Sequence, residues 1–156
     1  MIVVADTGPI VHLFWIGASS WALPPESILV VREVWQEIER HAPEALHDSR
    51  LVLSDAHRDT KLALPSGLDA GEAAAIALAV EHPGCLVLCD EREARRVCAE
   101  LEIRVIGSLG LIAQAANEGR IDVETAAQAM EALPARGRLH VTRELIELAI
   151  SKLRET

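Results

Sequence analysis

The chain has 156 residues, the length of one ordinary domain, and a net charge of −9, which opposes nucleic-acid binding unless a metal ion or an arginine cluster neutralises the phosphates. Half of the residues are hydrophobic but only 3% are aromatic, so Leu, Ile, Val and Ala must form the core. No apolar run reaches the roughly 18 residues of a membrane span and no secretory signal is visible, so we expect a cytoplasmic protein that does not bind membranes.

The first predicted element is a strand that ends on a carboxylate. Residues 2–5 are four consecutive apolar residues, a pattern typical of a parallel strand buried on both faces. Gly8 and Pro9 suit the cap and the first position of a helix, which we expect over residues 10–17. Asp6 is therefore predicted at the carboxyl end of a strand, where open α/β sheets bind ligands. Its burial requires a compensating hydrogen bond or cation.

The next predicted elements are a strand over residues 28–31 and a helix over residues 33–41. Glu37 borders the apolar side of this helix, and the pattern alone favours a solvated position for it. Residues 42–66 are polar and interrupted by prolines, with a short apolar run at 51–53 that indicates a third strand.

The strongest helix signal spans residues 68–82, which are almost entirely apolar after the first turn. Asp69 and Glu72 have the spacing of a capping box, so Glu72 is suited to satisfying the backbone amide of Asp69. A helix that is apolar all round is buried, however, and its first turn should then point toward the sheet.

The pattern of the first strand recurs at residues 85–89, an apolar run followed by Asp90 and a helix over 91–101. Asp90 can also be interpreted as the N-cap of that helix. Arg95 lies four residues after Glu91, a spacing typical of a solvated, charged helix face.

The rest of the chain predicts a fifth strand and three more helices, at residues 103–106, 107–119, 122–133 and 142–154. The last helix has a wide apolar face that includes Leu145 and Leu148. We expect the body of the domain or a second copy of the chain to cover it.

Alternating strands and helices indicate a three-layer α/β/α fold with a mostly parallel sheet of about five strands. Asp6 and Asp90 would then share one edge, and on neighbouring strands each would raise the pKa of the other unless a cation intervened. Carboxylates without thiolates or imidazoles match Mg²⁺ or Mn²⁺ and favour metal-assisted phosphodiester hydrolysis. Neither a phosphate-binding G-x-x-x-x-G-K-[ST] loop nor a dinucleotide-binding G-x-G-x-x-G motif is present.

Five segments share their motifs with one known family. They are V-A-D-T-G-P-I (4–10), V-W-Q-E-I (34–38), L-D-A-G-E-A-A-A-I-A-L-A (68–79), V-L-C-D-E-R-E-A-R (87–95) and I-G-S-L-G-L-I (106–112). The chain resembles the PIN-domain family of metal-dependent ribonucleases, especially the bacterial and archaeal VapC-like toxin branch. The resemblance implies one PIN-like domain over residues 1–156, with an α/β core at 1–119 and C-terminal helices at 120–156.

The resemblance also implies an acidic quartet that performs catalysis and coordinates the metal. Its members would be Asp6, Glu37, Glu72 and Asp90, with Glu91 beside Asp90 where many relatives have a second aspartate. Asp6 and Asp90 would lie on adjacent strands and bind the ion, while the two glutamates would be further ligands or would hold its water molecules. Thr7, the hydroxyl residue next to the first acid, and Arg95 are the expected substrate contacts.

The implied activity is an Mg²⁺- or Mn²⁺-dependent endoribonuclease that acts as the toxin of a toxin–antitoxin pair. RNA would be its substrate, a small antitoxin its protein partner and a homodimer its assembly. Two other interpretations stay open. One is an inert PIN-like scaffold that binds RNA or a protein, with the acids serving as caps and salt bridges. The other is a small phosphatase or nucleotide hydrolase that uses the same sheet edge.

Overall fold

A computed structural model describes residues 1–56 and 64–155 of the chain. Its centre is a five-stranded sheet in the order β3-β2-β1-β4-β5, and every pairing between neighbouring strands is parallel. The strands are β1 (Val3–Ala5), β2 (Ile28–Val30), β3 (Leu51–Leu53), β4 (Leu86–Leu88) and β5 (Arg104–Ile106). All five lie where the sequence predicts them, because each consists mainly of apolar residues that favour strands; only β5 contains a charged residue, the exposed Arg104.

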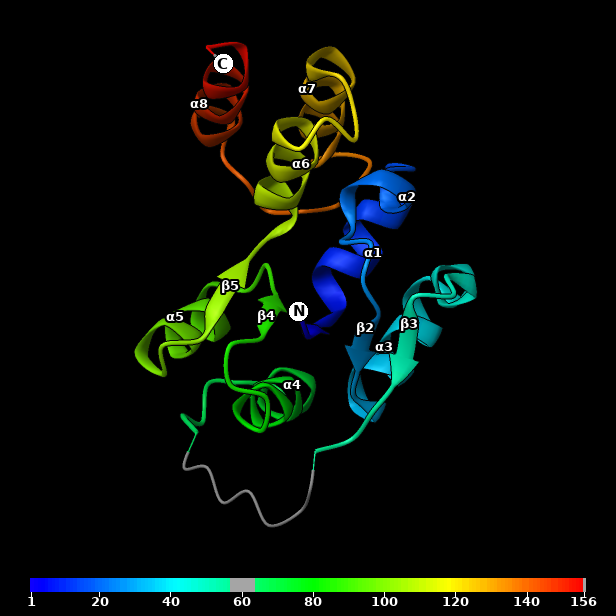
Figure 1. Ribbon diagram of the computed structural model, residues 1–156, viewed down its shortest axis with the longest axis vertical. Helices are drawn as coiled ribbons and strands as arrows, with labels where there is room; N and C mark the ends of the chain where they lie inside the picture. Colours follow the sequence, from blue (N-terminus) through cyan, green and yellow to red (C-terminus); the bar gives the residue numbers. More distant parts are fainter. Residues whose placement is uncertain (57–63, 156) are drawn as a thin grey trace.

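Helices cover both faces of this sheet, which confirms the predicted three-layer α/β/α fold (Figure 1). The α-helices are α1 (Thr7–Trp15), α2 (Ser19–Ala22), α3 (Arg32–His41), α4 (Ala70–Val80), α5 (Arg92–Glu100), α6 (Ser108–Asn117), α7 (Val123–Ala132) and α8 (Arg143–Arg154). Figure 1 shows α6, α7 and α8 gathered at one end of the molecule, beyond α1 and α2. Within the two described stretches, no helix has the length and apolarity that crossing a bilayer requires.

The central strand β1 positions the first predicted acid. Val3, Val4 and Ala5 are completely buried, with β2 on one side and β4 on the other. The backbone N–H of Asp6 donates to the carbonyl oxygen of Leu88 at 2.9 Å, so the ladder between β1 and β4 continues one residue past the strand. Asp6 and Asp90 therefore follow adjacent strands, as expected from the family resemblance.

Two predicted helix starts next to the acids are wrong, by three residues for α1 and by one residue for α5. Helix α1 begins at Thr7 with Asp6 as its N-cap, so Pro9 occupies the third helical position. Proline is tolerated there because the first N–H groups of a helix have no intrahelical partner. Helix α5 has Glu91 as its N-cap, and Asp90 does not cap it but accepts hydrogen bonds from Ser108 instead.

Two short elements were not predicted, the one-turn helix α2 and a 3₁₀ helix, η1, at Pro43–His47. Both are too short to show a helical period in the sequence. The C-terminal helices agree with the prediction, since Asp122 and Thr142 cap α7 and α8 by accepting from backbone N–H groups in their first turns.

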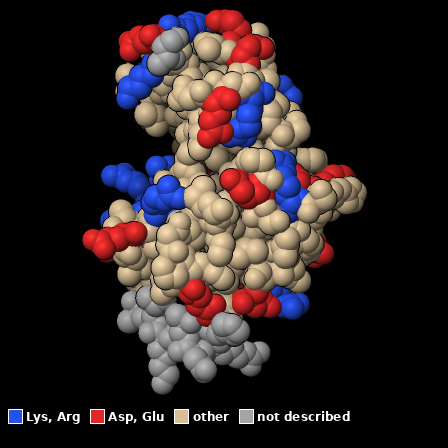
Figure 2. Space-filling model, in the orientation of Figure 1, with Lys and Arg blue, Asp and Glu red and all other residues tan. Residues whose placement is uncertain are grey.

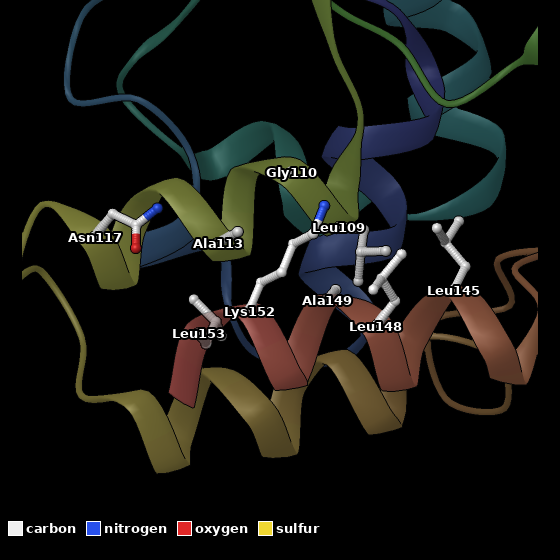
Figure 3. Close-up of a pocket in the computed structure, with 9 residues that line it drawn as sticks. All are labelled: Leu109, Gly110, Ala113, Asn117, Leu145, Leu148, Ala149, Lys152 and Leu153. Carbon is white, nitrogen blue, oxygen red and sulfur yellow. The ribbon is translucent and has the colours of Figure 1, made fainter. Parts of the chain in front are cut away.

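The surface of the molecule carries charged side chains of both signs and an apolar groove. On the face shown in Figure 2, acidic and basic side chains are interspersed among larger uncharged areas. An apolar groove of about 360 Å³ lies between α6 and α8 (Figure 3). Leu145 and Leu148 of α8 are 48% and 51% exposed beside it, and Lys152 extends from α8 toward α6. The apolar face expected on the last helix is thus partly uncovered.

Candidate functional site

A hollow of about 290 Å³ opens where β1 ends, and we call it the acidic hollow. The acids that line it are Asp6, Glu37, Asp69, Glu72 and Glu91. Its other lining residues are Thr7, Gly8, Val11, His12, Trp15, His41 and Arg138. Three of the four predicted acids thus meet in one place, although they come from the end of β1, from α3 and from the first turn of α4.

Asp6 is the most enclosed acid of the hollow, with 5% of its surface exposed. It is the N-cap residue of α1, but its carboxylate makes no capping hydrogen bond. The Cys89 thiol donates to its Oδ2 atom at 3.5 Å, which is a weak interaction. Burial raises the pKa of Asp6 to about 7, and the negative charges of Asp69 and Glu37 add to that rise.

Glu72 is also buried, with 8% of its surface exposed, because it lies in the first turn of a helix packed against the sheet. Its backbone N–H donates to Oδ1 of Asp69 at 2.7 Å, as the capping-box spacing predicts. The pKa of the Glu72 carboxyl is raised to about 8, chiefly by burial, with smaller contributions from a hydrogen bond with Asp69 and from the charges of Asp69 and Asp6. Asp69, interpreted from sequence only as a cap, is therefore part of the same electrostatic cluster.

Glu37 is held at the hollow by a neighbour in the structure that is distant in the sequence. The Thr7 hydroxyl donates to Oε2 of Glu37 at 2.7 Å. Gly71 makes the close approach of α4 to α3 feasible, since a Cβ atom there would lie 3.2 Å from the same Glu37 oxygen and 3.3 Å from Cγ2 of Val34. Glu37 thus faces the hollow and is half-buried, rather than solvated as its pattern alone favoured.

Asp90, the fourth predicted acid, lies beside the hollow rather than in its lining. Its carboxylate accepts from the backbone N–H of Ser108 at 2.7 Å and from the Ser108 hydroxyl at 2.6 Å. It is close to two lining residues: Nε2 of His12 lies 4.0 Å from Oδ2 of Asp90, and a Cβ atom on Gly8 would lie 3.2 Å from the same oxygen. Arg95 is likewise outside the lining, and its guanidinium approaches Gly107, where a Cβ atom would lie 2.6 Å from Arg95 Nη1 and 2.7 Å from Oδ1 of Asp90.

Several lining residues were not predicted as site residues, among them His12, Trp15 and Arg138. His12 and Trp15 are three residues apart on α1, so the helical spacing that follows Asp6 was a usable signal for both. Arg138 comes from the segment between α7 and α8, and its guanidinium carbon lies 4.5 Å from the centroid of the Trp15 ring. The sequence held no signal for that contact.

The donor chemistry of the hollow fits a hard divalent cation. Its buried ligand atoms are carboxylate oxygens, which Mg²⁺ and Mn²⁺ prefer, and a cation would offset the repulsion that raises both pKa values. Within residues 1–56 and 64–155, no three acidic, histidine or cysteine side chains converge tightly enough to form a ready-made cage. A bound Mg²⁺ usually keeps several of its own water molecules and needs only one or two carboxylate ligands from the protein.

The sequence was also compared with known proteins. A family model described as a PIN domain matches residues 2–155, which is nearly the whole chain. The chain belongs to the PIN-domain family. No protein of curated function matches it. PIN domains are generally nucleases that use divalent metals, and the acidic hollow at the end of β1 is the part of this PIN domain whose chemistry fits that activity.

Proposed function

We propose that this PIN domain is an Mg²⁺- or Mn²⁺-dependent endoribonuclease that hydrolyses RNA phosphodiester bonds in the acidic hollow. The observation that carries the proposal is the meeting of Asp6, Glu37 and Glu72 in one hollow. These acids are separated by more than thirty residues from one another in the sequence, and a helix-capping role for each would not require that they meet.

Asp6 and Glu72 would hold the ion, with Glu37 and Asp90 completing the set from either side. When bound, the ion would make a water molecule acidic enough to attack the phosphodiester and would stabilise the leaving oxygen. Asp90 can contribute because each carboxylate oxygen offers about two acceptor sites, and Ser108 uses only one on each oxygen. Glu91, on the rim, is available as a further acid.

The remaining polar contacts orient these acids. Thr7 fixes one oxygen of Glu37, and Ser108 fixes both oxygens of Asp90, so neither side chain has to be ordered when a ligand arrives. Thr7 therefore acts on the site through Glu37, in addition to the substrate contact expected from its sequence position. Arg95 would contact the substrate only where RNA extends past Asp90.

The acids also predict how the free site behaves. Because burial and mutual repulsion raise the pKa values of Asp6 and Glu72 to about 7 and about 8, both carboxyls are partly protonated at neutral pH without a cation. A divalent ion would stabilise their charged forms, so its binding should release protons and strengthen as the pH rises.

The finer parts of the proposal concern partners. We propose that the chain is the toxin of a toxin–antitoxin pair, restrained by a small antitoxin protein. A net charge of −9 favours a basic partner. We also propose a homodimer, supported by the exposed leucines of α8, which are unusual on a free surface.

The test is cleavage of a mixed pool of structured RNAs with Mn²⁺, with Mg²⁺ and with EDTA. Asp6→Asn protein controls for contaminating nucleases, and Glu37→Gln is compared with Glu39→Gln, which changes an exposed glutamate of the same helix outside the hollow. We expect metal-dependent cleavage that Asp6→Asn and Glu37→Gln remove and Glu39→Gln retains. Cleavage by Asp6→Asn at the wild-type rate would refute the assignment.

An inert scaffold is the second candidate, because two of the acids already have structural partners. Asp69 caps α4, and Asp90 accepts both hydrogen bonds from the first residue of α6. A melting temperature that does not rise with Mn²⁺ or Mg²⁺, together with no cleavage of any RNA, would favour this candidate over the nuclease.

A further inference from the structure

Trp15 and Arg138 form a stacked pair in the wall of the acidic hollow. The guanidinium carbon of Arg138 lies 4.5 Å from the centroid of the Trp15 ring, within the range of a cation–π contact. Both residues line the same hollow as Asp6 and Glu72. The contact with the ring does not use the N–H donors of arginine as hydrogen bonds, and these donors form a planar fork that can bind a ligand.

The turn that carries Arg138 is fixed to the body of the domain. The carbonyl oxygen of Gly137 lies 2.5 Å from Nδ1 of His12, which donates to it. A Cβ atom on Gly137 would lie 2.7 Å from the Leu133 carbonyl oxygen and 3.3 Å from Cγ2 of Ile16, the residue that follows α1, so only glycine fits there. The backbone N–H of Leu139 donates to the same Leu133 oxygen at 3.1 Å. The residues on both sides of Arg138, Gly137 and Leu139, are thus fixed by hydrogen bonds, and this places Arg138 over Trp15.

The backbone of Arg138 is unfavourable for its residue type. Its φ angle is +55°, in the left-handed region that glycine and asparagine adopt more readily than arginine. An arginine in such a conformation suggests that the side chain has a use that outweighs the strain. That use is not an ion pair within the protein, since no acid of residues 1–56 or 64–155 lies within 4.0 Å of its guanidinium. Several other arginines form such pairs, namely Arg32, Arg50, Arg96, Arg120, Arg143 and Arg154.

RNA approaching this domain needs a local cation. The net charge is −9, the hollow itself is acidic, and the face in Figure 2 shows charges of both signs rather than a broad basic surface. Affinity for single-stranded RNA rests largely on phosphates neutralised by Lys or Arg. Arg138 is the arginine that lines the hollow.

We propose that Arg138, stacked on Trp15, binds a phosphate of the RNA chain beside the bond that the acidic hollow cleaves. This inference rests on the proposed ribonuclease function. His12 acts as a positioning residue, because its bond to Gly137 fixes the turn and its ring packs edge-on against Trp15 at a centroid distance of 6.1 Å. The planar fork of arginine matches two phosphate oxygens, which a lysine cannot reproduce.

The experiment measures binding of a fluorescein-labelled single-stranded RNA in the Asp6→Asn background with Mg²⁺, where the RNA stays intact, over a range of KCl concentrations. Arg138→Gln is compared with Arg136→Gln, which removes an exposed arginine of the same turn that does not line the hollow. We expect about a tenfold loss of affinity for Arg138→Gln, with the slope of log K against log [KCl] reduced by about 0.7. Arg136→Gln should change neither value.

Three further variants separate the phosphate contact from a structural role. Arg138→Lys should keep the salt slope but lose part of the affinity, and Trp15→Leu should weaken binding more than Trp15→Phe. Arg138→Gly should bind as weakly as Arg138→Gln while its melting temperature stays at or above that of the parent, because glycine accepts the +55° φ angle.

The outcomes distinguish this inference from the function on which it rests. Equal losses for Arg138→Gln and Arg136→Gln would overturn it, because any surface cation would then serve. If Arg138→Gln binds RNA as tightly as its parent, and the protein that retains Asp6 cleaves RNA, the inference about Arg138 fails but the proposed function stands. If the protein neither binds nor cleaves RNA, both the inference and the proposed function fail. In protein that retains Asp6, we expect Arg138→Gln to raise the KM for RNA cleavage about tenfold and to leave kcat nearly unchanged.

Discussion

The acidic hollow and the apolar groove between α6 and α8 are similar in volume and opposite in chemistry. The hollow collects carboxylates from β1, α3 and α4, and burial raises the pKa values of Asp6 and Glu72. The groove collects aliphatic side chains of two neighbouring helices, with Leu145 and Leu148 half-exposed. The chemistry of the hollow therefore fits a cation, whereas the chemistry of the groove fits an apolar partner.

The two surfaces also differ in how much the surrounding fold specifies them. In the hollow, a threonine orients a glutamate that is 30 positions away, and Gly71 lets two helices approach closely. In the groove, the lining follows from the apolar stripes of α6 and α8 alone. Substitutions in the hollow should therefore change chemistry strongly and stability in either direction, whereas substitutions in the groove should leave the chemistry unchanged.

The largest effect is expected from removing the charge of Asp6. Asp6→Asn should lower the rate of metal-dependent RNA cleavage roughly 10²- to 10³-fold, since it removes a proposed ligand of the ion. The same variant should melt at a higher temperature than wild type at pH 8 in EDTA, because a buried, repelled carboxylate is removed and asparagine is a good N-cap. Cleavage assays and thermal melts of the same preparations measure both effects.

A gain in stability with a loss of activity would mark Asp6 as a functional residue rather than a structural one. The matched control is Asp122→Asn, which changes an exposed N-cap whose carboxylate does form a capping hydrogen bond to Thr125. It should leave cleavage unchanged and should not raise the melting temperature. If Asp6→Asn instead melted well below wild type, the carboxylate would be supporting the fold.

Sequence patterns predicted the sheet because each strand is a short apolar run that alternates with a helix, and this local signal sets the order of elements. The same patterns placed Asp6 correctly at the end of a central strand, where a carboxylate is enclosed. Glu37 was harder, since helical periodicity alone favoured a solvated position. What decides its position is the hydroxyl of Thr7, a contact between distant parts of the chain that no local pattern contains.

Asp90 and Arg138 show two different limits of the sequence. Asp90 was interpreted as a cap of the helix that follows it, but its carboxylate bonds to Ser108, because the parallel sheet places the start of α6 beside the end of β4. Capping spacing cannot distinguish the nearest helix in the sequence from the nearest in space. Arg138 lies in a turn without periodicity, and its place over Trp15 depends on how that turn packs on α1.

A smaller loss of cleavage activity is expected from substitutions of Thr7. They change the orientation of the Glu37 carboxylate without changing any charge in the hollow. Thr7→Val removes the hydroxyl that holds Glu37 and should reduce cleavage roughly tenfold, as loss of a hydrogen bond behind a metal ligand does. Thr7→Ser keeps the hydroxyl and should retain most of the activity. Equal activities of the valine and serine variants in a steady-state cleavage assay would show that this hydrogen bond does not orient the site.

The pH dependence of stability tests the electrostatics of the hollow without any substrate. Because their pKa values are raised to about 7 and about 8, Asp6 and Glu72 bind protons more tightly in the folded protein than in the unfolded chain. Stability from these groups is therefore complete below about pH 4 and is lost as the pH rises toward about 8. In EDTA, titration of these two groups should lower the melting temperature by on the order of 5 °C between about pH 4 and about pH 8.

Asp6→Asn provides the control for that measurement, since it should remove much of the fall while leaving all other titrating groups in place. Saturating Mg²⁺ should also flatten the curve by stabilising the charged carboxylates. If the melting temperature of the wild type in EDTA changed with pH as steeply as that of Asp6→Asn, repulsion between the carboxylates would not destabilise the hollow. The hollow would then not differ from the groove in this respect.

The smallest effect on chemistry is expected in the groove. Leu145→Ser combined with Leu148→Ser removes two half-exposed leucines, so cleavage should stay within about twofold of wild type, because neither side chain lines the hollow. If the proposed homodimer uses this face, wild-type protein should sediment as a dimer and the double variant as a monomer. The matched control replaces Val52 and Leu53, which are 42% and 43% exposed on the edge strand β3, with serine. A dimer that survives the α8 substitutions but not those on β3 would move the interface to the sheet edge, and the leucines of α8 would then need another partner.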